Sequence, residues 1–88
     1  MPFRRSTDDV LESINGVLSP YVGKLMARTA ASAHCRDLGI HAGEMSRDQV
    51  DALLGRLGLG LIVFIGKDKA QTVVETMRRA IDGLQEVQ

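Results

Sequence analysis

The chain has few of the residues that most disulfide frameworks, metal sites and catalytic sites need. Its 88 residues include one cysteine, no tryptophan and only three aromatic rings, and the formal net charge is zero. A single cysteine excludes an internal disulfide and suits a reducing compartment, so we expect a cytoplasmic protein. Zero net charge argues against a domain held to nucleic acid by bulk charge, because such domains carry a clear basic excess.

Long apolar runs are also lacking. The most apolar segment, Leu57 to Gly66, has ten residues and is too short to span a bilayer. The first five residues carry two arginines with no apolar stretch after them, which predicts neither a signal peptide nor an anchor. We therefore expect no membrane partner.

What is present is an ordinary globular balance, with 44% hydrophobic and 25% charged residues. We expect one domain over residues 6–84, a disordered N-terminus at 1–5 and a frayed C-terminus at 85–88. A core of this size with so few rings is only marginally able to offset the entropy of ordering the chain, and dimerisation would relieve that marginality.

Apolar spacing predicts helices throughout. A first helix should begin at Ser6 or Thr7 and bury a stripe made of Val10, Leu11, Ile14, Val17 and Leu18. Ser19 and Pro20 should start a second helix that runs to about Leu38, with Gly39 as its left-handed cap and Ile40 as the accompanying apolar contact.

The clearest start signal belongs to the third helix. Ser46 and Gln49 have the spacing of a capping box, and Met45 should pack on Val50 as a hydrophobic staple. This helix should end near Gly58. A last helix is predicted from about Asp68 to Leu84, with an apolar face made of Ala70, Val73, Val74, Met77, Ile81 and Leu84.

The run from Leu57 to Gly66 is ambiguous. Its β-branched residues suit a strand, but no second β-rich run is present to pair with it. We favour a tight turn at Gly58 and Gly60 that leads into the buried first turns of the last helix, and we expect the run to be the buried centre of the molecule. The predicted fold class is an all-α, four- to five-helix bundle of two helical hairpins.

A weak internal repeat accompanies this layout. A shift of 43 positions places Gly23, Lys24 and Ala27 on Gly66, Lys67 and Ala70, which suggests two hairpins related by a pseudo-twofold axis. The shared unit, an apolar residue followed by Gly, three residues and Ala, resembles the second half of the helix-hairpin-helix motif of DNA-binding proteins.

That resemblance implies phosphate contacts at Gly23, Lys24, Gly66 and Lys67, with Arg28 and Lys69 nearby. The chain departs from the motif because its earlier glycine is replaced by Tyr21 in one copy and Phe64 in the other. The alternative interpretation is that the two glycines only allow helices to cross closely.

Catalytic and metal chemistry finds little support. His34 and Cys35 are adjacent on a predicted helix and diverge by about 100°. They lack a second ligand pair for a metal and an orienting acid for a nucleophile. We predict no cofactor, no metal site and no enzyme activity.

The second helix offers the best candidate surface. Its polar side carries Lys24, Arg28 and Arg36, and its second half is small on nearly every side, with Ala27, Ala31 and Cys35 among those residues. Small side chains let another helix approach closely, either from a second subunit or from the same chain. We expect a small interaction or regulatory module that binds a protein partner or itself, and a nucleic-acid-binding module as the alternative.

Overall fold

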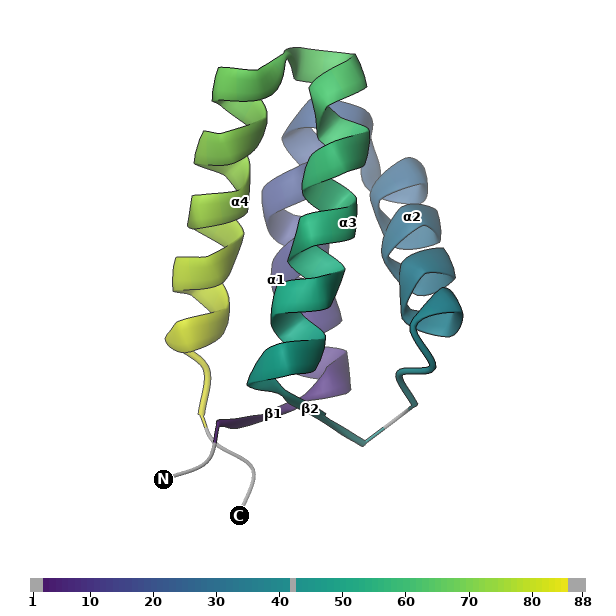
Figure 1. Cartoon of the computed structure of the whole chain (residues 1–88), viewed down its shortest axis with the longest axis vertical. Helices are drawn as coiled ribbons and strands as arrows, with labels where there is room; N and C mark the ends of the chain where they lie inside the picture. The colour runs from purple at the N-terminus through teal and green to yellow at the C-terminus, as the bar shows by residue number, and fades with distance from the viewer. Residues whose placement is uncertain (1–2, 42, 86–88) are drawn as a thin grey trace.

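Four helices and two short strands make up the part of the chain that the structure, a computed structural model, describes: residues 3–41 and 43–85 (Figure 1). The order is β1 (Arg4–Ser6), α1 (Thr7–Val22), α2 (Lys24–Asp37), β2 (Glu44–Ser46), α3 (Arg47–Ile65) and α4 (Lys67–Asp82). Helices account for 79% of these residues, which confirms the all-α class.

Each pair of helices is joined by one glycine. Gly23 links α1 to α2 with φ 86° and ψ 155°, and Gly66 links α3 to α4 with φ 84° and ψ 165°. Residues with a side chain rarely adopt this region of positive φ, whereas glycine adopts it at little cost because it has no Cβ. Both joints lie at the end of the bundle opposite the chain termini (Figure 1).

The two strands form a small antiparallel sheet that the sequence analysis did not predict. Arg4 pairs with Ser46, Arg5 with Met45 and Ser6 with Glu44. Three-residue strands give no recognisable alternation, so only the fold reveals the pairing. Within the segment 1–5, for which we expected disorder, Arg4 and Arg5 belong to β1, and residues 1–2 lie outside the described residues.

Two predicted helix boundaries are wrong. Pro20 does not start a second helix, because α1 continues through it to Val22. α3 does not end at Gly58, because it runs without a break through Gly58 and Gly60 to Ile65. The expected turn in the apolar run is therefore absent, and the run is the second half of α3.

The predicted caps at the start of α3 and at the end of α2 are confirmed. Ser46 and Gln49 form the full capping box at the start of α3. At the end of α2, Gly39 has a φ of 70°, and the amide of Ile40 donates to the carbonyl of Cys35. This is the six-to-one hydrogen bond of a Schellman motif, and Ile40 is buried beside it.

One apolar core lies inside the bundle. Its helical members are Val10, Ile14, Leu18, Ala27, Ala31, Cys35, Val50, Leu53, Leu54, Leu57, Leu61, Ala70, Val73, Met77 and Ile81. α1 packs mainly on α2 and α3 mainly on α4, whereas α2 and α3 touch least among the neighbouring helices. Within the described residues, no helix has the length and hydropathy needed to cross a membrane.

Candidate interaction surface

The apolar run that we expected at the buried centre is instead the most exposed apolar part of the molecule. Leu59 is 70% exposed, Val63 85% and Phe64 60%, whereas Leu57 and Leu61 are buried in the core and Ile65 packs against it. The expectation was wrong because a continuous helix presents its residues on all sides, and other helices cover only one side of this one.

The length of α3 explains why its end is uncovered. α1 has 16 residues and α3 has 19, and each follows directly from one of the paired strands. At 1.5 Å per residue, α3 extends roughly 4.5 Å further from the sheet, about one helical turn. The last turn of α3 therefore lies further from the sheet than the end of α1 does.

The exposed large apolar side chains gather around the two glycine joints. We call this surface the apolar end, and its members are Tyr21, Leu25, Met26, Leu59, Ile62, Val63 and Phe64. They come from three helices that meet at one end of the bundle (Figure 1). Exposed apolar patches mark interaction sites in monomeric proteins.

Two hollows flank α3 within this region. Between α2 and α3, a hollow of about 70 Å³ is lined by residues that include Met26, Ala30, His34 and Phe64. The Nδ1 atom of His34 is buried there and has no hydrogen-bond partner within the described residues. Between α3 and α4, a larger hollow of about 340 Å³ opens beside Gly55 and Gly58.

Cations surround the apolar end. All three lysines of the chain, Lys24, Lys67 and Lys69, lie in the first turns of α2 and α4, next to the glycine joints. Arg28 follows one turn further along α2, and Asp68 is the one carboxylate in these first turns. A neutral chain thus carries a locally basic rim around apolar surface.

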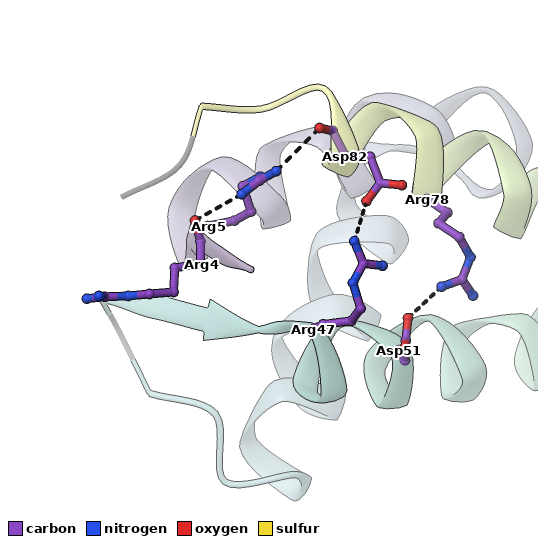
Figure 2. Close-up of polar contacts among 6 residues, drawn as sticks. All are labelled: Arg4, Arg5, Arg47, Asp51, Arg78 and Asp82. Carbon is purple, nitrogen blue, oxygen red and sulfur yellow. Dashed lines mark hydrogen bonds and ion pairs between the residues drawn. The ribbon is translucent and has the colours of Figure 1, made fainter. Parts of the chain in front are cut away.

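The opposite end of the bundle is ionic. Arg47 forms an ion pair with Asp82, with 3.3 Å between Nη2 and Oδ1, and Arg78 forms one with Asp51 (Figure 2). The guanidinium of Arg5 donates to the main-chain carbonyl of Asp82. These contacts fasten α3 to α4 and β1 to the end of α4, so the polar groups of this end serve the fold.

The candidate residues on α2 fall into two groups. Lys24, Arg28 and Arg36, which we placed on the polar side of this helix, are exposed. Ala27, Ala31 and Cys35 lie in the chain's own core, and they are the residues that allow α1 and α2 to pack closely. The small side chains of α2 could allow close approach by a second subunit or by a helix of the same chain. In the structure, they pack within the chain.

The four residues of the phosphate alternative lie at the two glycine joints. Gly23 and Gly66 share nearly the same backbone conformation, and each is followed by an exposed lysine. The amides of both glycines donate to carbonyls of the preceding helix, Ser19 and Ile62. The glycine N–H groups are therefore already used.

Cys35 has the properties of a core residue. Burial raises the pKa of its thiol because the charged thiolate would lose solvation. Within the described residues, no group of three or more histidine, cysteine, aspartate or glutamate side chains is placed to hold a metal ion.

The sequence does single out this site, because the apolar run from Leu57 to Gly66 stands out in it. We predicted that the run would be buried, and most of it is exposed. An apolar stretch with no polar side chain between Leu57 and Gly66 marks either a core or an interface.

The chain matches no protein-family model, no curated protein and no solved structure. The class that the fold and the surface define is thus a small helical bundle with an uncovered apolar end.

Proposed function

We propose that this chain is a small interaction module that binds protein, its own copies included, through the apolar end. The observation that carries the proposal is the gathering of seven exposed large apolar side chains around the two glycine joints. Interface centres are rich in aromatic residues and methionine and poor in charge, and the apolar end has Tyr21, Phe64 and Met26.

The rest of the surface supports this choice. The outer face of α4 is polar from Gln71 to Arg79, and α1 exposes Asp8, Asp9 and Glu12. An apolar end on an otherwise polar bundle leaves one face on which a partner can bury apolar area. The cationic rim would steer partners with acidic surfaces.

Capture from the source lysate on immobilised chain tests the proposal. The native chain should retain one or more proteins, and Phe64→Glu should lose them, since a charge at a 60% exposed position removes apolar contact without entering the core. Thr76→Glu on the polar face of α4 is the matched control and should retain them. The proposal fails if the native chain is a monomer at every concentration and Phe64→Glu changes no captured protein.

The alternative function is binding of nucleic acid through Gly23, Lys24, Gly66 and Lys67. The observation that favours it is the matched conformation of the two glycine joints, each with its lysine at the same end of the bundle. It predicts an affinity for duplex DNA that falls steeply with salt and is lost when Lys24 and Lys67 are both changed to Glu. Fluorescence anisotropy at two salt concentrations measures it.

We further infer that the two halves, each a strand, a helix, a glycine and a helix, are a repeat about a pseudo-twofold axis. Ser6 and Ser46 are 40 positions apart while Gly23 and Gly66 are 43 apart, so the second half has three extra residues inside α3. Experimental coordinates in which residues 4–37 fail to superpose on 44–80, with the three extra residues of α3 left out, would reject the repeat. The single free thiol supports a reducing compartment, the cytoplasm, as the place where the module acts.

A further inference from the structure

We propose that a partner of this module is a second copy of the chain, and that the dimer forms by antiparallel packing of α3 against α3 across a twofold axis near Leu57. This inference rests on the proposed function and specifies its partner and geometry. Its support comes from three features of α3: the spacing, the sizes and the charges of its outward residues.

The spacing is that of a helix–helix seam. We call Asp48, Ala52, Gly55, Leu59 and Ile62 the α3 stripe, and all five residues are exposed. Successive members are four, three, four and three residues apart, which gives the seven-residue repeat of helices that pack side by side. The core uses a different stripe of the same helix, made of Val50, Leu53, Leu54, Leu57 and Leu61.

The sizes are self-complementary. The first half of the stripe is small, with Ala52 and Gly55, and the second half is large, with Leu59 and Ile62. An antiparallel pairing centred on Leu57 places Gly55 opposite Leu59 of the second copy and Ala52 opposite Ile62 of the second copy. Every large side chain then meets a small one, and symmetry repeats each contact. A parallel pairing would place large on large and leave a gap beside Gly55.

The hollow between α3 and α4 provides the space for these large side chains. It measures about 340 Å³, and its lining includes Leu54, Gly55, Gly58 and Val74. Within the described residues, and apart from the adjoining residues and backbone of α3 itself, no atom lies within 4 Å of the position that a Cβ on Gly55 would occupy. The surface is open there. The Leu59 side chain of the second copy would fill apolar space that the monomer leaves to water.

The charges select the antiparallel orientation. Asp48 lies at the start of α3, and Lys67 is the first residue of α4, just past the end of α3. The pairing that sets Gly55 against Leu59 also brings Asp48 of one copy to Lys67 of the other, twice per dimer. Lys67 lines the same hollow as Leu59 and Ile62, so it lies on the side of α3 that faces the second copy.

Charge also separates this partner from the other candidates. An anionic lipid surface would use the lysine rim but would bring Asp48 no partner. A contact between the two apolar ends would oppose Lys24, Lys67 and Lys69 to their own copies. Only the antiparallel α3 pairing matches acid with base and large with small at the same time.

Exchange of the two charges tests the geometry. The native chain, at 9.6 kDa per copy, should have twice that mass in light scattering after size exclusion. Asp48→Lys and Lys67→Asp should each weaken the dimer by about tenfold or more, since each replaces two attractive pairs with two repulsive ones. An equimolar mixture of the two variants should restore the dimer, because both pairs become attractive again. Asp9→Lys and Lys69→Asp are the matched controls and should not alter the mass.

A substitution on the stripe tests the apolar contact. Leu59→Glu should be monomeric with an unchanged helical circular dichroism spectrum, since the side chain is 70% exposed in the monomer. Ala52→Glu is a second variant with the same expectation at another exposed position. A native chain that is a monomer at all concentrations overturns the inference, as does a dimer that Leu59→Glu leaves intact or that the mixture of charge variants fails to restore.

The outcomes separate this inference from the proposed function. A monomer that captures another protein through Phe64 keeps the function and rejects the α3 dimer, because Phe64 lies on the α2 side of α3, away from the stripe. A monomer that instead sediments with phosphatidylserine vesicles, and loses this binding in Val63→Glu, rejects the dimer in favour of a lipid surface.

Discussion

Gly58 lies where α3 packs tightly against Val74 of α4. A Cβ added to this glycine would lie 2.9 Å from Cγ2 of Val74. One added to Gly60 would meet no atom within 4 Å in the part of the chain that the structure describes, apart from the adjoining residues and backbone of α3 itself. Both glycines lie inside a helix, so alanine should gain up to about 1 kcal/mol of helix stability at either position. At Gly58 this gain is opposed by overpacking, which costs roughly 1 to 3 kcal/mol.

Gly60→Ala should therefore raise the free energy of unfolding by about 0.5 to 1 kcal/mol, and Gly58→Ala should lower it or leave it unchanged. Urea unfolding followed by circular dichroism measures both. Equal stabilisation by the two substitutions would show that Val74 moves aside freely and that the close approach carries no constraint.

The thiol of Cys35 gives a pH dependence with a defined sign. Burial raises its pKa above the ordinary value of 9.0, so the folded chain keeps a proton that the unfolded chain releases. The contribution of this thiol to stability is complete below pH 9 and is lost as the pH rises toward the folded pKa. As the pH rises from about 9 to about 10, the native chain should lose stability more steeply than Cys35→Ala does, since the unfolded thiol releases its proton there and the folded one keeps it.

Urea unfolding at several pH values compares the two slopes, and the lysine and tyrosine titrations cancel because both chains share them. Parallel slopes would mean that Cys35 ionises alike in the folded and unfolded chains. A complementary check is the reaction with a thiol reagent, which should be slow until urea unfolds the chain.

At the scale of elements, the start of α3 is stabilised by a cap that the start of α1 lacks. The hydroxyl oxygen of Ser46 accepts from the amide of Gln49, while Ser6, the residue before α1, makes no side-chain cap hydrogen bond. Ser46→Ala should cost about 1 kcal/mol of stability, and Ser6→Ala only a few tenths. Thermal unfolding of both variants measures the two losses of stability. Similar losses would mean that the capping box adds no stability beyond that of the strand pairing around it.

Two caps that depend on residues close together in the sequence were predicted correctly, and the strands, which depend on distant residues, were not. The Ser46 cap and the Gly39 end of α2 could be predicted because each depends on residues within one turn of each other. The two strands could not be predicted, because each has only three residues. They are recognisable as strands only through their pairing with each other, about 40 positions apart in the sequence.

The end of α3 was predicted wrongly because Gly58 and Gly60 have low helix propensity, and packing against α4 overrides that propensity. Its burial was predicted wrongly for a different reason. Apolar composition indicates that a segment will be buried, but it does not tell whether the same chain or a partner buries it. The three-residue difference in length between α1 and α3, which leaves the end of α3 exposed, is visible only in the fold.

The whole molecule is polarised along its long axis. One end holds the sheet and the ion pairs Arg47–Asp82 and Arg78–Asp51, and the other holds the apolar residues and the lysines (Figures 1 and 2). The four residues of these two ion pairs find their partners within the chain. The apolar end is uncovered in the monomer. The α3 stripe, which shares Leu59 and Ile62 with it, is the surface whose sizes and charges match a second copy.

This uncovered surface predicts that the stability of the folded chain depends on its concentration. If folding and association are coupled, each tenfold rise in concentration should raise the melting temperature by about 4 °C for a dimer of this size. Leu59→Glu, whose side chain is largely outside the monomer core, should melt at one temperature across the same range. Scanning calorimetry from micromolar to millimolar concentration compares the two. A native chain whose melting temperature does not move would show that the bundle gains no stability from a second copy and that α3 is uncovered in solution.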